Sequence, residues 1–170
     1  MEIEIPRRLV KSVTFLLFIG IPLMLGLHVS LETERNLPLL LTPRLALLQA
    51  YRQEIQDWVK VFEMADSGLA KLLDGPATSL FDQNEQVSRL YQRISQTNQM
   101  IDQTPVPTTF EPLNDLLVQT ATTYLDATVQ AARWINEPDE ENLQLAKKAL
   151  VSSKAMLERL YLNPWMDVHP

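Results

Sequence analysis

The sequence predicts an all-α protein in which one N-terminal transmembrane helix is followed by an extracytoplasmic up-down four-helix bundle. Residues 12–31 contain no Asp, Glu, Lys or Arg, and four later segments carry apolar residues at alternating spacings of three and four. Pro and Gly residues separate those segments. The chain therefore divides into a cytoplasmic N-terminus (1–11), a transmembrane helix (12–31), a juxtamembrane segment (32–41), a four-helix bundle (42–163) and a C-terminal tail (164–170).

Residues 12–31 are long enough to cross a bilayer, because this stretch at about 1.5 Å per residue covers roughly the 30 Å of the hydrocarbon core. The anchor residues expected to face lipid are Val13, Phe15, Leu16, Leu17, Phe18, Ile19, Pro22, Leu23, Leu25 and Leu27. Pro22 predicts a kink in this helix. A cleaved signal peptide is the alternative. The apolar stretch is longer than the usual about 7–15 residues and no A-x-A-like site follows it, so an uncleaved anchor is favoured.

The flanking charges predict the topology. Arg7, Arg8 and Lys11 precede the span, whereas the residues directly after it are mainly acidic. Basic flanks stay on the cytoplasmic side, so the N-terminus is expected in the cytoplasm and the C-terminal block outside, at the cell membrane.

His28 lies about one turn from the outer end of the predicted span. An intramembrane imidazole is a candidate ligand for a haem or a chlorophyll. Its depth favours the simpler interpretation, in which the ring reaches water at the headgroups. No cofactor and no metal site are therefore expected.

The composition after Leu31 restricts the function classes. This part has 12 Lys/Arg and 19 Asp/Glu, since three basic and two acidic residues of the totals of 15 and 21 lie before it. Such an acidic block without basic clusters argues against nucleic acid as a partner. The chain has no cysteine, which excludes disulfides, thiolate catalysis and Cys-based metal sites.

The first bundle helix is predicted to begin with Thr42 as N-cap and Pro43 at the first helical position, and to end at Gly75-Pro76. Its apolar stripe consists of Leu48, Tyr51, Ile55, Trp58, Phe62, Ala65, Leu69 and Leu72.

Three further helices follow, separated by proline-containing breaks. The second begins near Ser79 and ends before the segment TPVPTTFEP, the third runs from Pro112 to about Asn136, and the fourth opens at Pro138 and ends at Asn163-Pro164. Their stripes are Leu80, Val87, Leu90 or Tyr91, Ile94 and Met100 or Ile101; Leu113, Leu117, Thr120 or Ala121, Tyr124, Ala127 or Thr128, Ala131 and Ile135; and Leu143, Ala146, Leu150, Leu157 and Leu160. Near-antiparallel packing hides all four stripes. The small residues of the third stripe allow either close packing or a core completed by a partner.

The sequence contains no motif of an enzyme. After residue 31 only His169 can supply an imidazole, so the paired Glu-x-x-His motifs of di-iron bundles are absent, as are G-x-S-x-G, H-E-x-x-H and phosphate-loop patterns. Glu54 with Asp57, and the acidic run at 139–141, are interpreted as a solvated flank and a helix start. A non-catalytic protein is expected.

Two segments are the predicted partner contacts. Leu37, Leu39, Leu40 and Leu41 form an apolar juxtamembrane run, and Pro164, Trp165 and Met166 place large side chains on the tail. The run is expected in the outer membrane interface or against a neighbouring subunit. The tail is expected on the end of the bundle or on a partner surface.

In its layout of one span followed by a bundle without redox ligands, the chain resembles single-span accessory subunits of bacterial membrane electron-transfer complexes, such as alternative complex III. The resemblance implies a structural subunit that binds integral membrane proteins and lipid and stabilises a respiratory or photosynthetic complex. Two other functions stay open, namely an extracytoplasmic ligand-binding or sensing bundle and a pigment- or haem-binding subunit that uses His28.

Overall fold

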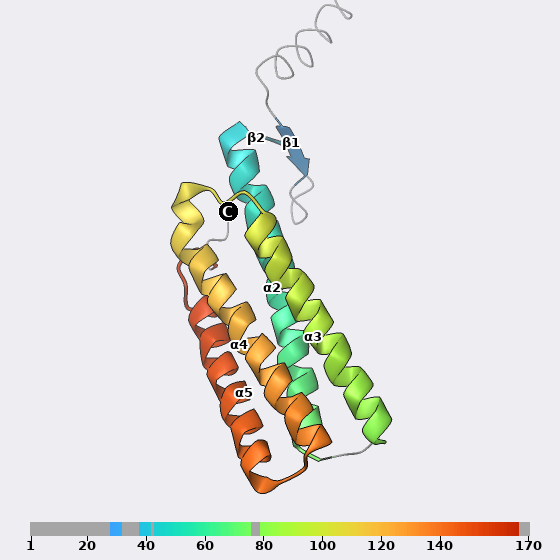
Figure 1. The fold of residues 1–170 in the computed structure, drawn as a ribbon. Coiled ribbons are helices and arrows are strands. Elements are labelled where there is room, and N and C mark those ends of the chain that lie inside the picture. The colour runs from blue at the N-terminus through green and yellow to red at the C-terminus, as the bar shows by residue number, and fades with distance from the viewer. Residues whose placement is uncertain (1–27, 32–37, 42, 76–78, 167–170) are drawn as a thin grey trace, which may run out of the picture. The chain divides into compact units, whose positions relative to one another are not determined.

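The computed structural model describes residues 28–31, 38–41, 43–75 and 79–166 of the 170-residue chain (Figure 1). The chain forms two compact units, residues 1–52 and residues 53–170. The described elements are β1 (His28–Leu31), β2 (Pro38–Leu41), α2 (Pro43–Leu73), α3 (Leu80–Gln103), the 3-10 helix η1 (Thr108–Phe110), α4 (Glu111–Asn136) and α5 (Glu140–Tyr161). The four helices predicted between residues 42 and 163 are confirmed, close to the predicted bounds.

The first unit contains an antiparallel pair of short strands that the sequence analysis did not predict. His28 of β1 pairs with Leu41 of β2, and Leu31 pairs with Pro38. The prediction that residues 28–31 complete a transmembrane helix is therefore wrong, and residues 38–41, predicted only as part of a juxtamembrane segment, form a strand. A short apolar run has no periodicity that separates helix from strand, and here cross-strand pairing satisfies the backbone polar groups.

Among the described residues, no helix combines the length and the hydropathy that a membrane crossing requires. The ten anchor residues from Val13 to Leu27 lie outside the described residues, as do Leu37 and the basic residues Arg7, Arg8 and Lys11. The anchor and its topology stay predictions from the sequence.

The second unit is a helical bundle made of residues 53–73 of α2 together with α3, α4 and α5. Figure 1 shows that successive helices of this unit run in opposite directions. Residue 53 and the C-terminus of α5 consequently lie at the same end, with the α3–α4 link, which we call the entry end. The α2–α3 and α4–α5 links lie at the other end, which we call the turn end.

Helix α4 is the central helix of the bundle. It packs against both α3 and α5, and it buries nine residues where α3 buries five. The residues predicted to thin its stripe are all buried, namely Thr120, Ala121, Ala127, Thr128 and Ala131. Small side chains at these positions allow neighbouring helices to approach closely, because the interaxial distance depends on the side chains at the contact.

Three buried hydroxyl groups of the core, on Thr120, Thr128 and Ser153, bond within their own helices. Thr120 donates to the Leu116 carbonyl at 2.7 Å, and Ser153 donates to the Ala149 carbonyl at 3.0 Å. Bonds of this kind to the preceding turn let Thr and Ser lie in a core without a partner on another helix.

Side-chain caps fix the starts of two helices. The Asp82 amide donates to the Ser79 hydroxyl at 3.2 Å at the start of α3, and the Asn142 amide donates to Asp139 Oδ1 at 2.7 Å at the start of α5. The prediction that Leu80 begins the α3 stripe is wrong. Leu80 is 59% exposed because it lies in the first turn, at the end of the helix, and Gln83 is the first buried residue of α3.

Helices α2 and α3 approach each other at Gly68. A Cβ atom at this position would lie 3.1 Å from Leu90 Cδ1 of α3, which is a tight contact. The glycine therefore leaves room for the Leu90 side chain between the two helices.

We expect Gly68→Leu to lower the free energy of unfolding by about 1–3 kcal/mol, because the added carbons overpack a filled site. Leu90→Ala in the same chain should recover part of the loss. Urea unfolding followed by circular dichroism measures both effects, and Ser67→Leu at the neighbouring exposed position is the matched control. Equal midpoints for the two leucine variants would contradict the tight approach.

Candidate functional site

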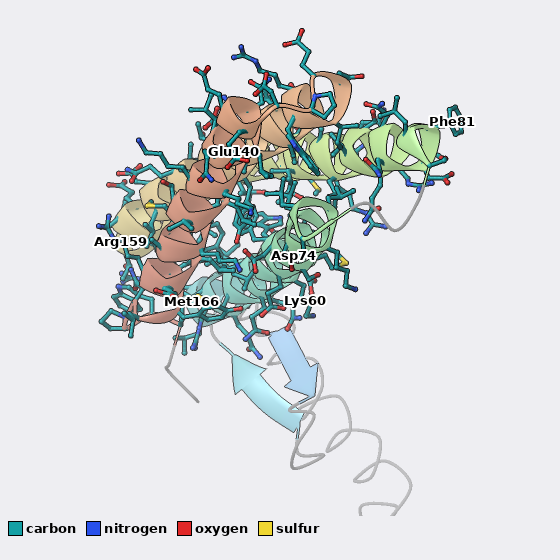
Figure 2. The ribbon with its side chains drawn as sticks, turned by 90° about the horizontal axis from the view of Figure 1, so that it is seen from below. Lys60, Asp74, Phe81, Glu140, Arg159 and Met166 are labelled. Atoms are coloured by element: carbon teal, nitrogen blue, oxygen red, sulfur yellow. The ribbon has the colours of Figure 1, made fainter. Side chains whose placement is uncertain are left out.

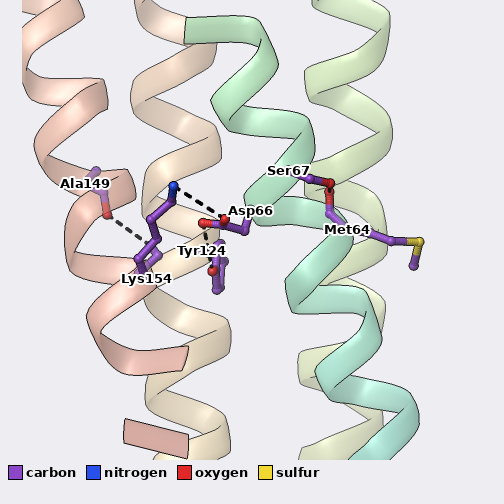
Figure 3. Close-up of polar contacts among 7 residues, drawn as sticks. Met64, Asp66, Ser67, Tyr124, Ala149 and Lys154 are labelled. Carbon is purple, nitrogen blue, oxygen red and sulfur yellow. Dashed lines mark hydrogen bonds and ion pairs between the residues drawn. The ribbon is translucent and has the colours of Figure 1, made fainter. Parts of the chain in front are cut away.

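A polar cluster joins three helices in the middle of the bundle. Asp66 of α2 lies between Tyr124 of α4 and Lys154 of α5 (Figure 3). The Tyr124 hydroxyl donates to Asp66 Oδ1 at 3.3 Å, and Lys154 Nζ lies 3.6 Å from Asp66 Oδ2. The Asp66 side chain is 24% exposed and that of Lys154 is 45% exposed, so the ion pair is open to solvent on the lysine side.

The Tyr124 ring also packs against α2 through an apolar contact. It stacks on the Phe62 ring of α2 with a centroid distance of 5.8 Å and an interplanar angle of 6°. Both side chains are fully buried. An aromatic pair of this kind contributes about 0.5–1.5 kcal/mol beyond the burial of its area. The sequence placed both residues on core stripes, but no sequence signal indicated that Asp66 and Lys154 would meet Tyr124.

A second tyrosine links α5 to α2 nearer the entry end. The Tyr161 hydroxyl donates to Glu63 Oε1, one helical turn before Asp66. Burial and the neighbouring carboxylate raise the pKa of Tyr161 to about 12, with burial the larger cause. Burial, followed by the Asp66 charge and hydrogen bond, also raises the pKa of Tyr124.

These pKa shifts define what the cluster can do chemically. Both phenols keep their protons at neutral pH and act as hydrogen-bond donors to carboxylates. A general base or a nucleophile would need a pKa shifted toward neutrality, which is the opposite direction. The cluster is suited to holding α2, α4 and α5 together.

The described residues contain no group of three or more His, Asp or Glu side chains placed to hold a metal ion. Two of the acidic residues that the sequence analysis examined as possible functional carboxylates, Asp57 and Asp139, have structural contacts. Asp57 forms an exposed ion pair with Lys60 at 2.8 Å, and Asp139 caps α5.

The predicted contact tail packs on the entry end of its own bundle. The Trp165 ring meets the Phe110 ring edge-on at a centroid distance of 5.2 Å and an interplanar angle of 68°. Trp165 still exposes 41% of its surface. Pro164 is exposed and Met166 is half-buried. Of the two tail positions left open by the sequence, docking on the bundle end is therefore observed. The sequence analysis missed Phe110 because it lies outside every stripe.

The other predicted contact residues and His28 lie in the first unit. Leu39, Leu40 and Leu41 belong to β2, and His28 begins β1. In this unit the structure defines the backbone pairing of these residues, which places His28 opposite Leu41.

Two depressions mark the surface of the bundle. One, of about 280 Å³, lies between α4 and α5 and is lined by residues that include Thr122, Asp126, Leu145 and Lys148. Another, of about 370 Å³, lies along α3 around Arg89. Both are open to solvent, whereas sites for small molecules bury most of the ligand surface. Neither depression identifies a ligand.

Comparisons of the chain with models of protein families, with curated proteins and with solved structures gave no match.

We expect the Asp66 and Tyr124 substitutions to be coupled. Asp66→Ala should cost about 1–3 kcal/mol of unfolding free energy because it leaves the buried Tyr124 hydroxyl without its acceptor. Tyr124→Phe keeps the ring stack and should cost about 0.5–1.5 kcal/mol. The double variant should cost less than the sum, measured by urea unfolding of all four chains. Strictly additive costs would show that the hydrogen bond does not contribute.

The raised tyrosine pKa values predict a loss of stability in alkali. Below the unfolded pKa of about 10 both states keep the phenol protons and the stabilisation is complete. Between pH 10 and about 12 the unfolded chain releases protons that folded Tyr161 retains, so the free energy of unfolding falls. Tyr124 acts in the same direction.

Urea unfolding at several pH values in this window measures the effect. The variant with Tyr124→Phe and Tyr161→Phe should show a smaller alkaline loss than the parent chain. Tyr91→Phe, at an exposed position of α3, is the control. An identical pH dependence in all three chains would refute the assignment.

Proposed function

We propose that this chain is a non-catalytic, membrane-anchored accessory subunit whose bundle stabilises a larger complex of integral membrane proteins, with respiratory or photosynthetic electron transfer as the favoured setting. The observation that carries the proposal is the uncharged apolar stretch that begins at residue 12 behind a basic flank and continues up to β1 at His28. A single-pass protein with a cytoplasmic N-terminus and an extracytoplasmic bundle follows from it.

The polar side chains of the bundle support a structural role. Asp66, Tyr124 and Lys154 form contacts between helices, and the tyrosine pKa values are raised away from neutrality. The proposal assigns these residues to holding the bundle together and gives none of them a chemical step.

Two segments are proposed to lie toward the membrane complex. These are the juxtamembrane residues 37–41 and the tail residues Pro164, Trp165 and Met166. The strand pairing of Pro38–Leu41 with His28–Leu31 gives the first of them a defined backbone. The exposed part of Trp165 gives the second an aromatic surface.

The proposal is tested on the tagged full-length chain in its native membrane. We expect the protein to stay in the membrane pellet after an alkaline carbonate wash, because an inserted helix resists extraction. Leu17→Arg with Leu23→Arg should abolish retention, since each central arginine costs about 2.5–3.5 kcal/mol on insertion. Val129→Arg with Val151→Arg adds the same charge at exposed positions of the bundle and should leave retention unchanged.

Purification in mild detergent then tests the accessory role. Large membrane subunits should copurify in fixed stoichiometry, identified by mass spectrometry. A monodisperse protein without partners would refute the accessory role. Absorption bands that are lost in His28→Ala would instead favour the pigment- or haem-binding function.

A further inference from the structure

An Asp-Gly pair lies directly after the last residue of α2. Asp74 and Gly75 are the only place in the chain where Asp or Asn precedes Gly. Asp74 follows Leu73, with which α2 ends, and both residues of the pair are exposed. Figure 2 looks onto the turn end of the bundle and shows Asp74 at the tip of α2. The pair is therefore accessible to water and lies outside the helix.

We propose that Asp74 is a site of spontaneous isomerisation, in which a succinimide converts the Asp74–Gly75 peptide bond into an isoaspartyl bond. The backbone nitrogen of Gly75 attacks Cγ of the protonated Asp74 carboxyl group. An N–Cγ bond forms, and the hydroxyl group of the carboxyl leaves as water with the amide proton. Water then adds to the main-chain carbonyl of Asp74 and breaks its bond to nitrogen. One water is released and one is taken up, so the reaction needs no cofactor and no oxidant.

The Gly75 amide is available as the nucleophile. The preceding amide, that of Asp74, still donates to the Ala70 carbonyl at 3.0 Å, but the Gly75 amide has no hydrogen bond among the described residues. A Cβ atom at Gly75 would have no neighbouring atom within 4 Å, so the space around it is open. Gly75 also has a φ of 139°, which a residue without a side chain adopts readily.

The Asp74 side chain is available as the electrophile. Within the described part of the chain its carboxylate takes part in no ion pair. Ring closure also requires the Asp74 backbone to rotate about its Cα–C bond away from the helical value. A residue inside a helix cannot do this without breaking hydrogen bonds, whereas Asp74 lies past the last helical residue.

Asp66 and Ser67 form the matched pair that the fold protects. Ser67 is also a small residue after an aspartate, but both residues lie in the interior of α2, where each amide bonds to the preceding turn. The Asp66 carboxylate accepts from Tyr124 and pairs with Lys154. Succinimide formation at Asp66 would require α2 to open, so the reaction is expected at Asp74 alone of the two.

Isomerisation would change the backbone at the start of the α2–α3 link. It adds one methylene group to the main chain and leaves the former main-chain carboxylate of Asp74 as a side group. The change directly follows the buried residues Leu72 and Leu73, which hold the last turn of α2 in the core. The reaction needs only residues of the bundle and does not depend on the proposed membrane anchoring.

Incorporation of heavy oxygen from water tests the proposal, because opening of the succinimide places one oxygen atom from water in the aspartyl residue. The full-length chain in mild detergent is incubated for several weeks at neutral pH in water enriched in the heavy isotope. It is then returned to ordinary water and digested with trypsin. The tryptic peptide 72–89 contains Asp74, and the peptide 61–71 contains Asp66. Mass spectrometry with electron-transfer fragmentation locates the label and identifies the isoaspartyl form.

We expect label and isoaspartate at Asp74 of the folded chain, and neither at Asp66. In urea, where α2 is unfolded, Asp66 should also acquire label. Asp74→Glu should remove the label from peptide 72–89, because glutamate would have to close a six-membered imide, which forms much more slowly. Circular dichroism checks that this substitution at an exposed position leaves the helices intact.

Three results would overturn the proposal. An unlabelled Asp74 in the folded chain would show that the succinimide does not form. Equal labelling of Asp74 and Asp66 in the folded chain would show that the end of α2 does not select the site. Label that persists in peptide 72–89 of the Asp74→Glu variant would place the reaction at another residue.

Discussion

Tyr124 is the buried residue through which α2, α4 and α5 meet in the middle of the bundle. Its ring must be covered and its hydroxyl must have an acceptor, because an unpaired buried hydroxyl is costly. The Phe62 ring covers the Tyr124 ring. Asp66, four residues later on the same face of α2, accepts the hydrogen bond from the Tyr124 hydroxyl. Lys154 approaches the other oxygen of Asp66 and brings α5 into the same junction. These requirements favour one axial position of α2, because Asp66 must stay level with both Tyr124 and Lys154.

Helix α3 is held by both apolar and polar contacts. Leu90 occupies the space left by Gly68 of α2, and α3 packs against α4. The Asn84 and Asn136 side chains join α3 to α4 through hydrogen bonds of 3.4 and 3.2 Å. The buried hydroxyls of Thr120, Thr128 and Ser153 bond to their own helices, whereas the Tyr124 hydroxyl bonds across to Asp66 of α2.

The helices were predictable because their boundaries have local chemical causes. Ser79 and Asp139 cap their helices, Pro105 and Pro107 interrupt the chain, and the stripe of α4 is buried at every predicted position. The errors occurred where local signals are ambiguous. Leu80 matched the period but lies in a first turn that faces solvent, and His28–Leu31 is an apolar run that the structure forms as a strand. Periodicity cannot distinguish a strand of four residues from the end of a helix.

By itself, the sequence determined the number of bundle helices, their bounds and most of their buried residues, because caps, breaks and stripes act over a few residues. Only the tertiary structure decided which polar residues meet. Asp66, Tyr124 and Lys154 are far apart in the chain. The stripe predicts that Tyr124 is buried, but it gives no sign of the polar partners before the helices pack. The docking of Trp165 on Phe110 was decided in the same way, because it depends on two helix ends arriving at one place.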